Sequence, residues 1–188
     1  KTKNNNKMGE ITEKIKFEKD MKAGGMILYE RKKATIEKVK EFHTAFDVYS
    51  NDKPSIIPDE QWKLRISLLA EELKELEEGC EKKDMVEIAD ALTDLQYVLD
   101  GAYLAFGMQN IKDELFDHIH ESNMSKLCDT PEIAQATKDK YLAEGVVTYI
   151  KFDENSGKYM VKRDSDNKVL KSIDYRPADC GTILIKYI

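Results

Sequence analysis

Four successive stretches of the chain place hydrophobic residues three or four positions apart, and this spacing most constrains the fold. It is the spacing of one face of an α-helix, so each stretch predicts an amphipathic helix with one buried side. Breakers at Pro54, Pro58, Gly79 and Gly107 separate the stretches. The predicted helices run from Arg31 to Phe46, from Asp59 to Gly79, from Asp84 to Gly107 and from Ile111 to about Lys126.

The second and third predicted helices carry the clearest hydrophobic stripes, and we expect these stripes to face the core. In the second helix, with Asp59 as its predicted N-cap, the stripe is Trp62, Ile66, Leu69, Leu73 and Leu76. In the third helix it is Ile88, Leu92, Leu95, Leu99, Ala102 and Phe106. A short connection at 80–83 predicts that these two helices pack antiparallel.

The character of the sequence changes after Cys128. Thr130 and Pro131 are typical of a helix N-terminus and predict a short helix that ends at Gly145. Residues 146–152, 159–163 and 168–173 are typical of short strands, separated by turn-forming residues. We therefore expect a mainly α protein with an N-terminal tail or weak helix at 1–29, a four-helix core at 30–127, and a C-terminal appendage of a helix and a β-hairpin at 128–188.

Composition and charge exclude several classes of protein. No hydrophobic run approaches the roughly 18 residues of a membrane span, and the Lys/Asn-rich first seven residues do not resemble a secretory signal. We therefore expect a cytoplasmic protein without a membrane partner. The three cysteines form no CxxC pair. Residues 71–100 contain eleven acidic and three basic residues, a block that would repel nucleic acid and attract divalent cations.

Acidic residues of the second and third helices follow the edge of the hydrophobic stripes. On a helical wheel, Glu72 lies at the edge of the stripe, with Glu71 and Glu75 on the same side. In the third helix Glu87, Asp90 and Asp94 are spaced i, i+3, i+7 and form one line. If the helices pack antiparallel, these six carboxylates share one cleft. Like charges this close need neutralisation, and oxygen ligands suit Mg²⁺.

Two readings of the acidic residues compete with a magnesium site. Acidic residues at helical spacing can form a solvated face, as in a non-enzymatic helical assembly protein. A di-iron carboxylate bundle also places acids in a helical core, but it needs ExxH on two helices. This chain offers only a DxxH at Asp117 and His120, without a second copy.

The ordered motifs along the chain resemble those of a known enzyme family. Glu71-Glu72-Leu73-Lys74-Glu75 followed by Glu87-Ile88-Ala89-Asp90 is similar to the EExxE and ExxD pair of the MazG-like all-α nucleoside triphosphate pyrophosphatases. Further blocks extend the resemblance over about 130 residues and are similar to the phosphoribosyl-ATP pyrophosphohydrolase-like branch. They are Val39 to His43, Leu64-Arg65, Ala91 to Val98, Gly107, His120 to Lys126, and Lys168 to Lys171.

The resemblance implies a Mg²⁺-dependent hydrolase, in which Mn²⁺ can substitute, that cleaves a nucleoside triphosphate into a monophosphate and pyrophosphate. The substrate it implies is a deoxynucleotide, in a house-cleaning role; phosphoribosyl-ATP is the alternative, and a phosphatase that removes phosphates singly is another. Carried over by motif, the metal ligands are Glu72, Glu75, Glu87 and Asp90. Glu71 corresponds to a further metal ligand or to the group that activates water, and Asp94 to an outer ligand of water or of a ribose hydroxyl.

The remaining candidate residues concern the substrate. Cationic and polar candidates for the phosphates are Arg65, Asn123, Lys126 and Lys171. Candidates for a base pocket are Phe42, His43, Phe46 and Trp62, although aromatic residues at this spacing also fit core positions.

Two further features of the sequence are departures from the pattern of the branch and an excess of hydrophobic residues. The chain has an extra helix and hairpin between Lys126 and Lys168, and Asn167 stands where the branch often has Gly. Val86, Tyr97 and Leu104 lie outside a single stripe, which predicts more hydrophobic surface than one helix face buries. Together with the resemblance, this predicts a homodimer.

Overall fold

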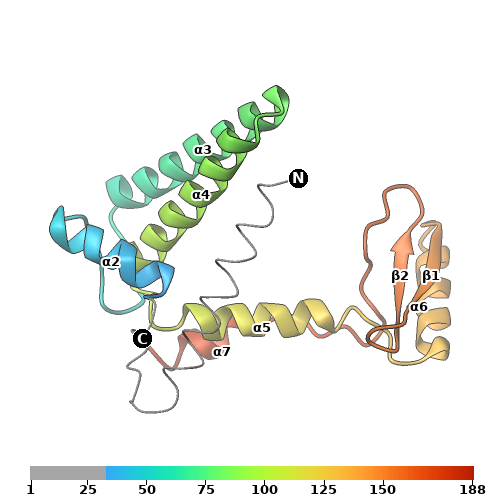
Figure 1. Cartoon of the computed structure of the whole chain (residues 1–188). Coiled ribbons are helices and arrows are strands. Elements are labelled where there is room, and N and C mark those ends of the chain that lie inside the picture. The colour runs from blue at the N-terminus through green and yellow to red at the C-terminus, as the bar shows by residue number, and fades with distance from the viewer. Residues whose placement is uncertain (1–32) are drawn as a thin grey trace, which may run out of the picture. The chain divides into compact units, whose positions relative to one another are not determined.

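The computed structural model describes residues 33–188, of which residues 35–188 form one compact unit. The predicted tail at 1–29 therefore lies outside the described residues. The described part is mainly helical, as predicted, with one antiparallel pair of strands (Figure 1). None of its helices combines the length and the hydrophobicity that a membrane span requires.

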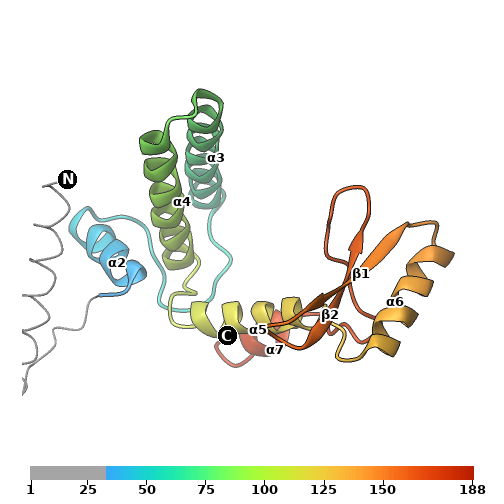
Figure 2. The same ribbon diagram turned by 45° about the vertical axis from the view of Figure 1, so that its right-hand side comes forward.

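A helical hairpin forms the centre of the predicted core. Helices α3 (Asp59–Lys82) and α4 (Met85–Ala105) lie side by side and antiparallel (Figure 2). The Asp84 side chain caps α4 by accepting hydrogen bonds from the N–H groups of Val86 and Glu87. Two details of the prediction for α3 are wrong: Asp59 is its first residue rather than its N-cap, and the helix continues past Gly79 to Lys82. Lys83, at φ 56°, ends it in the left-handed conformation.

The predicted stripes are only partly buried in the α3–α4 hairpin: Leu69 and Leu76 of α3 and Leu95 of α4 are half-buried. Leu73 of α3 is 59% exposed and Leu92 of α4 is 52% exposed. Arg65 is buried instead, and Gly79 lies so close to α4 that a Cβ atom there would be 3.1 Å from the backbone nitrogen of Ile88. Arg65 and Gly79 therefore lie in the seam between the helices, together with half-buried leucines.

Helix α2 (Thr35–Ala45) packs on α4, and the loop that follows it crosses the C-terminal end of α4. Asn51 holds this loop: its backbone N–H donates to the carbonyl of Leu104 at 3.0 Å and its side-chain amide to that of Ala105 at 2.7 Å. Gly107, at φ +72°, lies against the carbonyl of Lys53, where a Cβ atom would collide. The loop is therefore fixed to the C-terminal end of α4, which packs against α3, the helix that carries Arg65.

Helix α5 (Lys112–Met124) continues the core, and the short helix α7 (Cys180–Leu184) packs against it. Asp100 of α4 is fully buried and forms an ion pair with Lys112. Ile111 and Leu115 bury Ile183. The sequence did not predict α7. Leu104, which was expected to be surplus hydrophobic surface, is 1% exposed and belongs to the core.

The C-terminal appendage contains α6 (Pro131–Ala143), β1 (Thr148–Asp153) and β2 (Lys158–Arg163). The strands are antiparallel, with Thr148 opposite Arg163 and Asp153 opposite Lys158. The predicted third strand at 168–173 is wrong, since only an isolated bridge pairs Val169 with Lys162. The N–H of Leu170 still donates to the carbonyl of Val161 in β2 at 2.9 Å. Beyond it, side chains of α6 accept the hydrogen bonds of this segment: the N–H of Lys171 donates to Tyr141 and that of Ile173 to Thr137.

Candidate functional site

A cluster of carboxylates lies on the α3–α4 hairpin around Glu72. Glu72 is half-buried, whereas Glu71 and Glu75 on the same helix are exposed. Burial raises the pKa of Glu72, and the charges of Glu75, Asp94, Glu71 and Asp90 raise it further. The structure thus brings five of the six predicted acids within electrostatic reach of one another, and both helices contribute.

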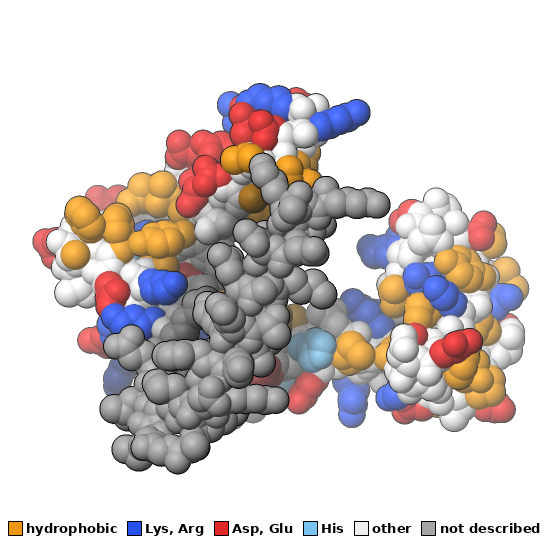
Figure 3. All heavy atoms as spheres, viewed as in Figure 1, with side chains coloured by type: hydrophobic (Ala, Val, Ile, Leu, Met, Phe, Trp, Pro, Cys, Tyr) orange, Lys and Arg blue, Asp and Glu red, His pale blue; other side chains and the backbone are white. Residues whose placement is uncertain are grey.

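These five carboxylates have no cationic partner in the described part of the chain. Within residues 33–188, no Lys, Arg or His nitrogen lies within 4.0 Å of any of them. The lysines nearest in sequence are engaged elsewhere: Lys74 pairs with Glu78 at 3.4 Å, and Lys82 pairs with Glu87 at 3.0 Å. Glu87, the sixth predicted acid, therefore has a cation of its own at the tip of the hairpin. Figure 3 shows acidic side chains gathered over this hairpin, below the basic tip.

The donor set suits a hard divalent cation, because it consists of carboxylate oxygens only. As the side chains stand, no three of the described His, Cys, Asp or Glu residues form a closed metal-binding group. Mg²⁺ does not need one, since it usually takes one or two carboxylates and fills its other positions with water and phosphate oxygens. An open acidic cluster on a helix pair is consistent with this kind of binding.

The aromatic candidates lie on α2 and at the start of α3. Phe42 and Phe46 pack together with their ring centres 4.5 Å apart, and Tyr97 of α4 meets Phe42 edge-on at 5.9 Å. Both phenylalanines are exposed, so their rings are not core residues of this chain. Trp62 donates from its indole N–H to Asp59 at 3.2 Å.

His43 and Arg65 lie buried together beside Gly101. A Cβ atom at position 101 would be 3.2 Å from Nε2 of His43 and 3.4 Å from Nη1 of Arg65. Burial lowers the pKa of His43, the charge of Arg65 lowers it further, and a backbone hydrogen bond with Tyr49 acts in the opposite direction. Sequence reasoning missed Gly101, whose only signal is its position seven residues after Asp94, on the same face of α4.

The other predicted phosphate-binding residues make their contacts in the C-terminal part of the chain. Lys126 donates to the side-chain oxygen of Asn123 at 2.7 Å, and the ammonium of Lys171 lies 4.4 Å from the centre of the Tyr175 ring. In the described part of the chain, neither lysine forms an ion pair with the acidic cluster.

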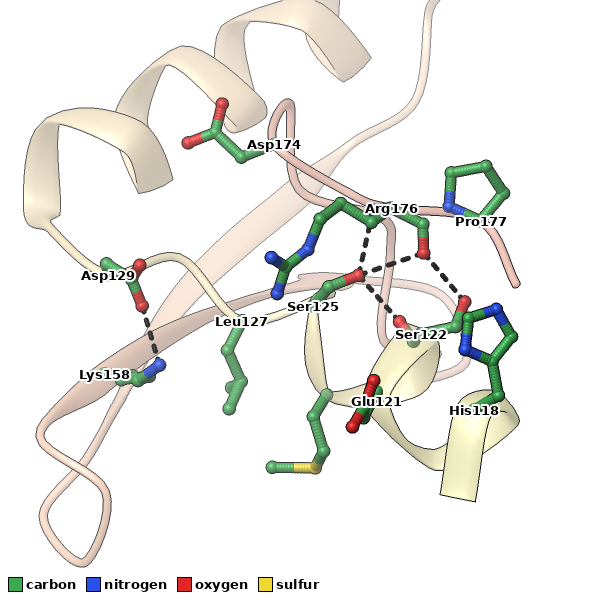
Figure 4. Close-up of a pocket in the computed structure, with 11 residues that line it drawn as sticks. His118, Glu121, Ser122, Ser125, Leu127, Asp129, Lys158, Asp174, Arg176 and Pro177 are labelled. Carbon is green, nitrogen blue, oxygen red and sulfur yellow. Dashed lines mark hydrogen bonds and ion pairs between the residues drawn. The ribbon is translucent and has the colours of Figure 1, made fainter. Parts of the chain in front are cut away.

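A cavity of about 590 Å³ lies at the C-terminal end of α5 (Figure 4). Ser122 donates to the carbonyl of Arg176 at 2.8 Å, and the N–H of Arg176 donates to Ser125 at 2.9 Å. On the opposite wall Lys158 pairs with Asp129 at 2.7 Å. Sequence reasoning did not single out Arg176, because nothing in the local pattern places it against α5.

The α3–α4 hairpin carries the EExxE and ExxD acids in the order that resembles the all-α nucleoside triphosphate pyrophosphatases. Residues 39–123 match the family model described as phosphoribosyl-ATP pyrophosphohydrolase. Residues 39–123 therefore carry the domain of that family, which belongs to the MazG-like superfamily, and the match indicates a pyrophosphohydrolase. A search of curated proteins finds no match. The matched region includes every predicted metal ligand and ends before Lys126 and Lys171.

Proposed function

We propose that the protein is a Mg²⁺-dependent hydrolase that cleaves a nucleoside triphosphate between its α and β phosphates, releasing a monophosphate and pyrophosphate. The observation that carries this proposal is the cluster around Glu72, where charges from two helices raise the pKa of a carboxyl within a pyrophosphohydrolase domain. Such a cluster costs stability unless a cation joins it. Mn²⁺ is expected to replace Mg²⁺.

The acids divide into two roles in this proposal. Glu72, Glu75, Glu87 and Asp90 hold the metal, which when bound neutralises the phosphate oxygens and activates water. Glu87 has to leave Lys82 to do so, and this lysine is then free to approach a phosphate. Glu71 is exposed, so it can accept the proton of the attacking water. Asp94 orients a water or a ribose hydroxyl.

The substrate is proposed to be a deoxynucleotide triphosphate. Phe42 and Phe46 present exposed rings on which a base can stack. Trp62, which is 38% exposed, is proposed as a further stacking residue. Asn123, Lys126 and Lys171 are proposed to hold the phosphates distal to the cleavage point.

A nucleotide panel tests the proposed reaction directly. The purified protein is incubated with each ribo- and deoxynucleoside triphosphate and with phosphoribosyl-ATP in Mg²⁺, and pyrophosphate is resolved from phosphate by ion chromatography. We expect pyrophosphate with at least one deoxynucleotide, loss of turnover in Glu75→Gln, and unchanged turnover in Glu144→Gln on the exposed C-terminus of α6. Release of phosphate alone, or equal activity in Glu75→Gln, would contradict the proposal.

We also propose that the protein is a cytoplasmic homodimer. Ile66 and Leu73 of α3 and Leu92 and Leu99 of α4 are 41–59% exposed, although they form regular hydrophobic stripes. A second copy would bury them. Light scattering after size-exclusion chromatography should give twice the mass of the chain, and Leu73→Lys with Leu92→Lys should give the monomer mass.

A further inference from the structure

Arg65 is a buried cation that has no counter-ion among residues 33–188. Arg65 belongs to α3 and is 5% exposed. No carboxylate among residues 33–188 lies within 4.0 Å of its side chain. Its Nε and Nη2 atoms are buried and have no hydrogen-bond partner there. Burial alone lowers the pKa of Arg65. Native proteins rarely leave such donors unsatisfied, so these two atoms call for an acceptor from outside residues 33–188.

The two free donors have a defined geometry. Nη1 is the nitrogen that lies against Gly101 of α4. Nε and Nη2 carry parallel N–H bonds along another edge of the planar guanidinium. Such a fork fits two acceptors that lie side by side on one planar group.

A cavity of about 620 Å³ adjoins Arg65. Its lining combines the ring of Tyr49, the side chain of Leu64 and the amide of Gln61 with one further charge, the carboxylate of Asp47. A triphosphate would be repelled by Asp47 and would need more than one cation. A flat, uncharged heterocycle fits this lining, since it uses the hydrophobic faces and the amide.

The cavity lies at one end of the seam that carries the acids. Arg65 and Glu72 are seven residues apart, which is two helical turns and an axial rise of about 10 Å on the same face of α3. Gly101 and Asp94 have the same separation on α4. A nucleotide whose α phosphate lies at the acids can therefore extend its base along the seam toward Arg65.

We propose that Arg65 is a specificity-determining residue that donates two hydrogen bonds to a base with two adjacent acceptors. Cytosine presents such a pair in N3 and O2, and guanine in O6 and N7. Adenine pairs an acceptor with a donor, and thymine places an N–H between its carbonyls, so either base satisfies only one arm of the fork. This inference rests on the proposed function, because it assumes that the ligand is a nucleotide.

Binding of deoxynucleoside monophosphates tests the proposal without requiring turnover. Calorimetry in Mg²⁺ compares dCMP, dGMP, dAMP and dTMP on the wild type, on Arg65→Lys, and on Arg163→Gln as a control in the β-hairpin. We expect dCMP or dGMP to bind at least roughly tenfold more tightly than dAMP and dTMP. Arg65→Lys, which keeps the charge and loses the fork, should bring all four affinities to within about threefold, and Arg163→Gln should keep the preference.

The outcomes separate this inference from the proposed function. A base preference without hydrolysis of any triphosphate supports base recognition by Arg65 and contradicts the proposed hydrolase activity. Hydrolysis with equal affinity for all four monophosphates supports the hydrolase and contradicts base recognition by Arg65. A base preference that survives in Arg65→Lys also contradicts base recognition by Arg65. Absence of nucleotide binding overturns both. If Arg65→Lys does not fold, Arg65→Met serves as the second variant, since a hydrophobic residue of similar size replaces a buried charge without leaving it unpaired.

Discussion

Gly101 of α4 leaves the space that the guanidinium of Arg65 occupies, since a Cβ atom at position 101 would lie 3.4 Å from Nη1. Gly79, at the other end of the hairpin, faces the backbone of α4 instead. A Cβ atom at position 79 would lie 3.1 Å from the backbone nitrogen of Ile88. The two glycines of one helix pair therefore have different tolerance for a methyl group. Side chains can shift by a few tenths of an ångström, whereas packed helix backbones shift only together.

We expect Gly79→Ala to destabilise the protein by about 1–3 kcal/mol through overpacking. Gly101→Ala should change the free energy of unfolding by less than about 1 kcal/mol, because higher helix propensity offsets the contact with Arg65. Urea denaturation of both variants measures these values. Equal destabilisation would mean that Arg65 and His43 are as rigid as the backbone.

Glu72→Gln should stabilise the protein in the absence of divalent metal. The neighbouring charges that raise the pKa of Glu72 also oppose folding at neutral pH, at a few tenths of a kcal/mol per pair, so the melting temperature should rise by about 1–3 °C. Millimolar Mg²⁺ should raise the melting temperature of the wild type and have little effect on Glu72→Gln or Glu75→Gln. A metal response that is equal in all three proteins would place the cation elsewhere.

Glu71 and Glu72 should differ in what their loss removes. Glu72→Gln should weaken Mn²⁺ binding and turnover together, because the residue is half-buried among the other acids. Glu71→Gln should keep most of the Mn²⁺ affinity and lose turnover, as expected for a group that acts in the transition state. Calorimetry beside steady-state kinetics measures both. If the two variants lose metal affinity equally, Glu71 is another metal ligand, and Asp94 becomes the candidate for the base.

Hydrolysis in ¹⁸O-labelled water should place the label in the nucleoside monophosphate. The proposed attack is at the α phosphorus, so the oxygen of water stays with that phosphate and pyrophosphate leaves unlabelled. Mass spectrometry of the two products distinguishes the positions. Label in the pyrophosphate alone would move the attack to the β phosphorus.

His43 should make the stability of the protein fall in mild acid. Its pKa is lowered from 6.5 by burial and by the charge of Arg65, so the unfolded chain takes up a proton before the folded protein does. Stability from neutral His43 is therefore complete above about pH 6.5 and decreases as the pH falls toward the lowered pKa. His43→Gln should show a shallower decrease in melting temperature between about pH 7 and pH 5. Parallel curves would show that His43 does not titrate differently on folding.

Much of the fold follows from local patterns that neighbouring residues specify. The periodic hydrophobic residues predicted α3 and α4, and Thr130 caps α6 as the pattern indicated. The placement of Glu72 with Asp90 and Asp94 was also predictable, because a short connection between two helices leaves few ways to pair their faces. These features depend on helix geometry, which a sequence encodes within a few turns.

The sequence by itself determined that the chain is helical and that acids from two helices meet, because helical period, capping and motif spacing are local. The tertiary structure alone decided which residues of the two helices are buried: Leu73 of the predicted stripe is exposed, whereas the charged Arg65 is buried against Gly101. It also decided that residues 168–173 bond to Thr137 and Tyr141 rather than form a strand. Each of these outcomes depends on partners distant in the sequence, whose competing contacts no local pattern can rank.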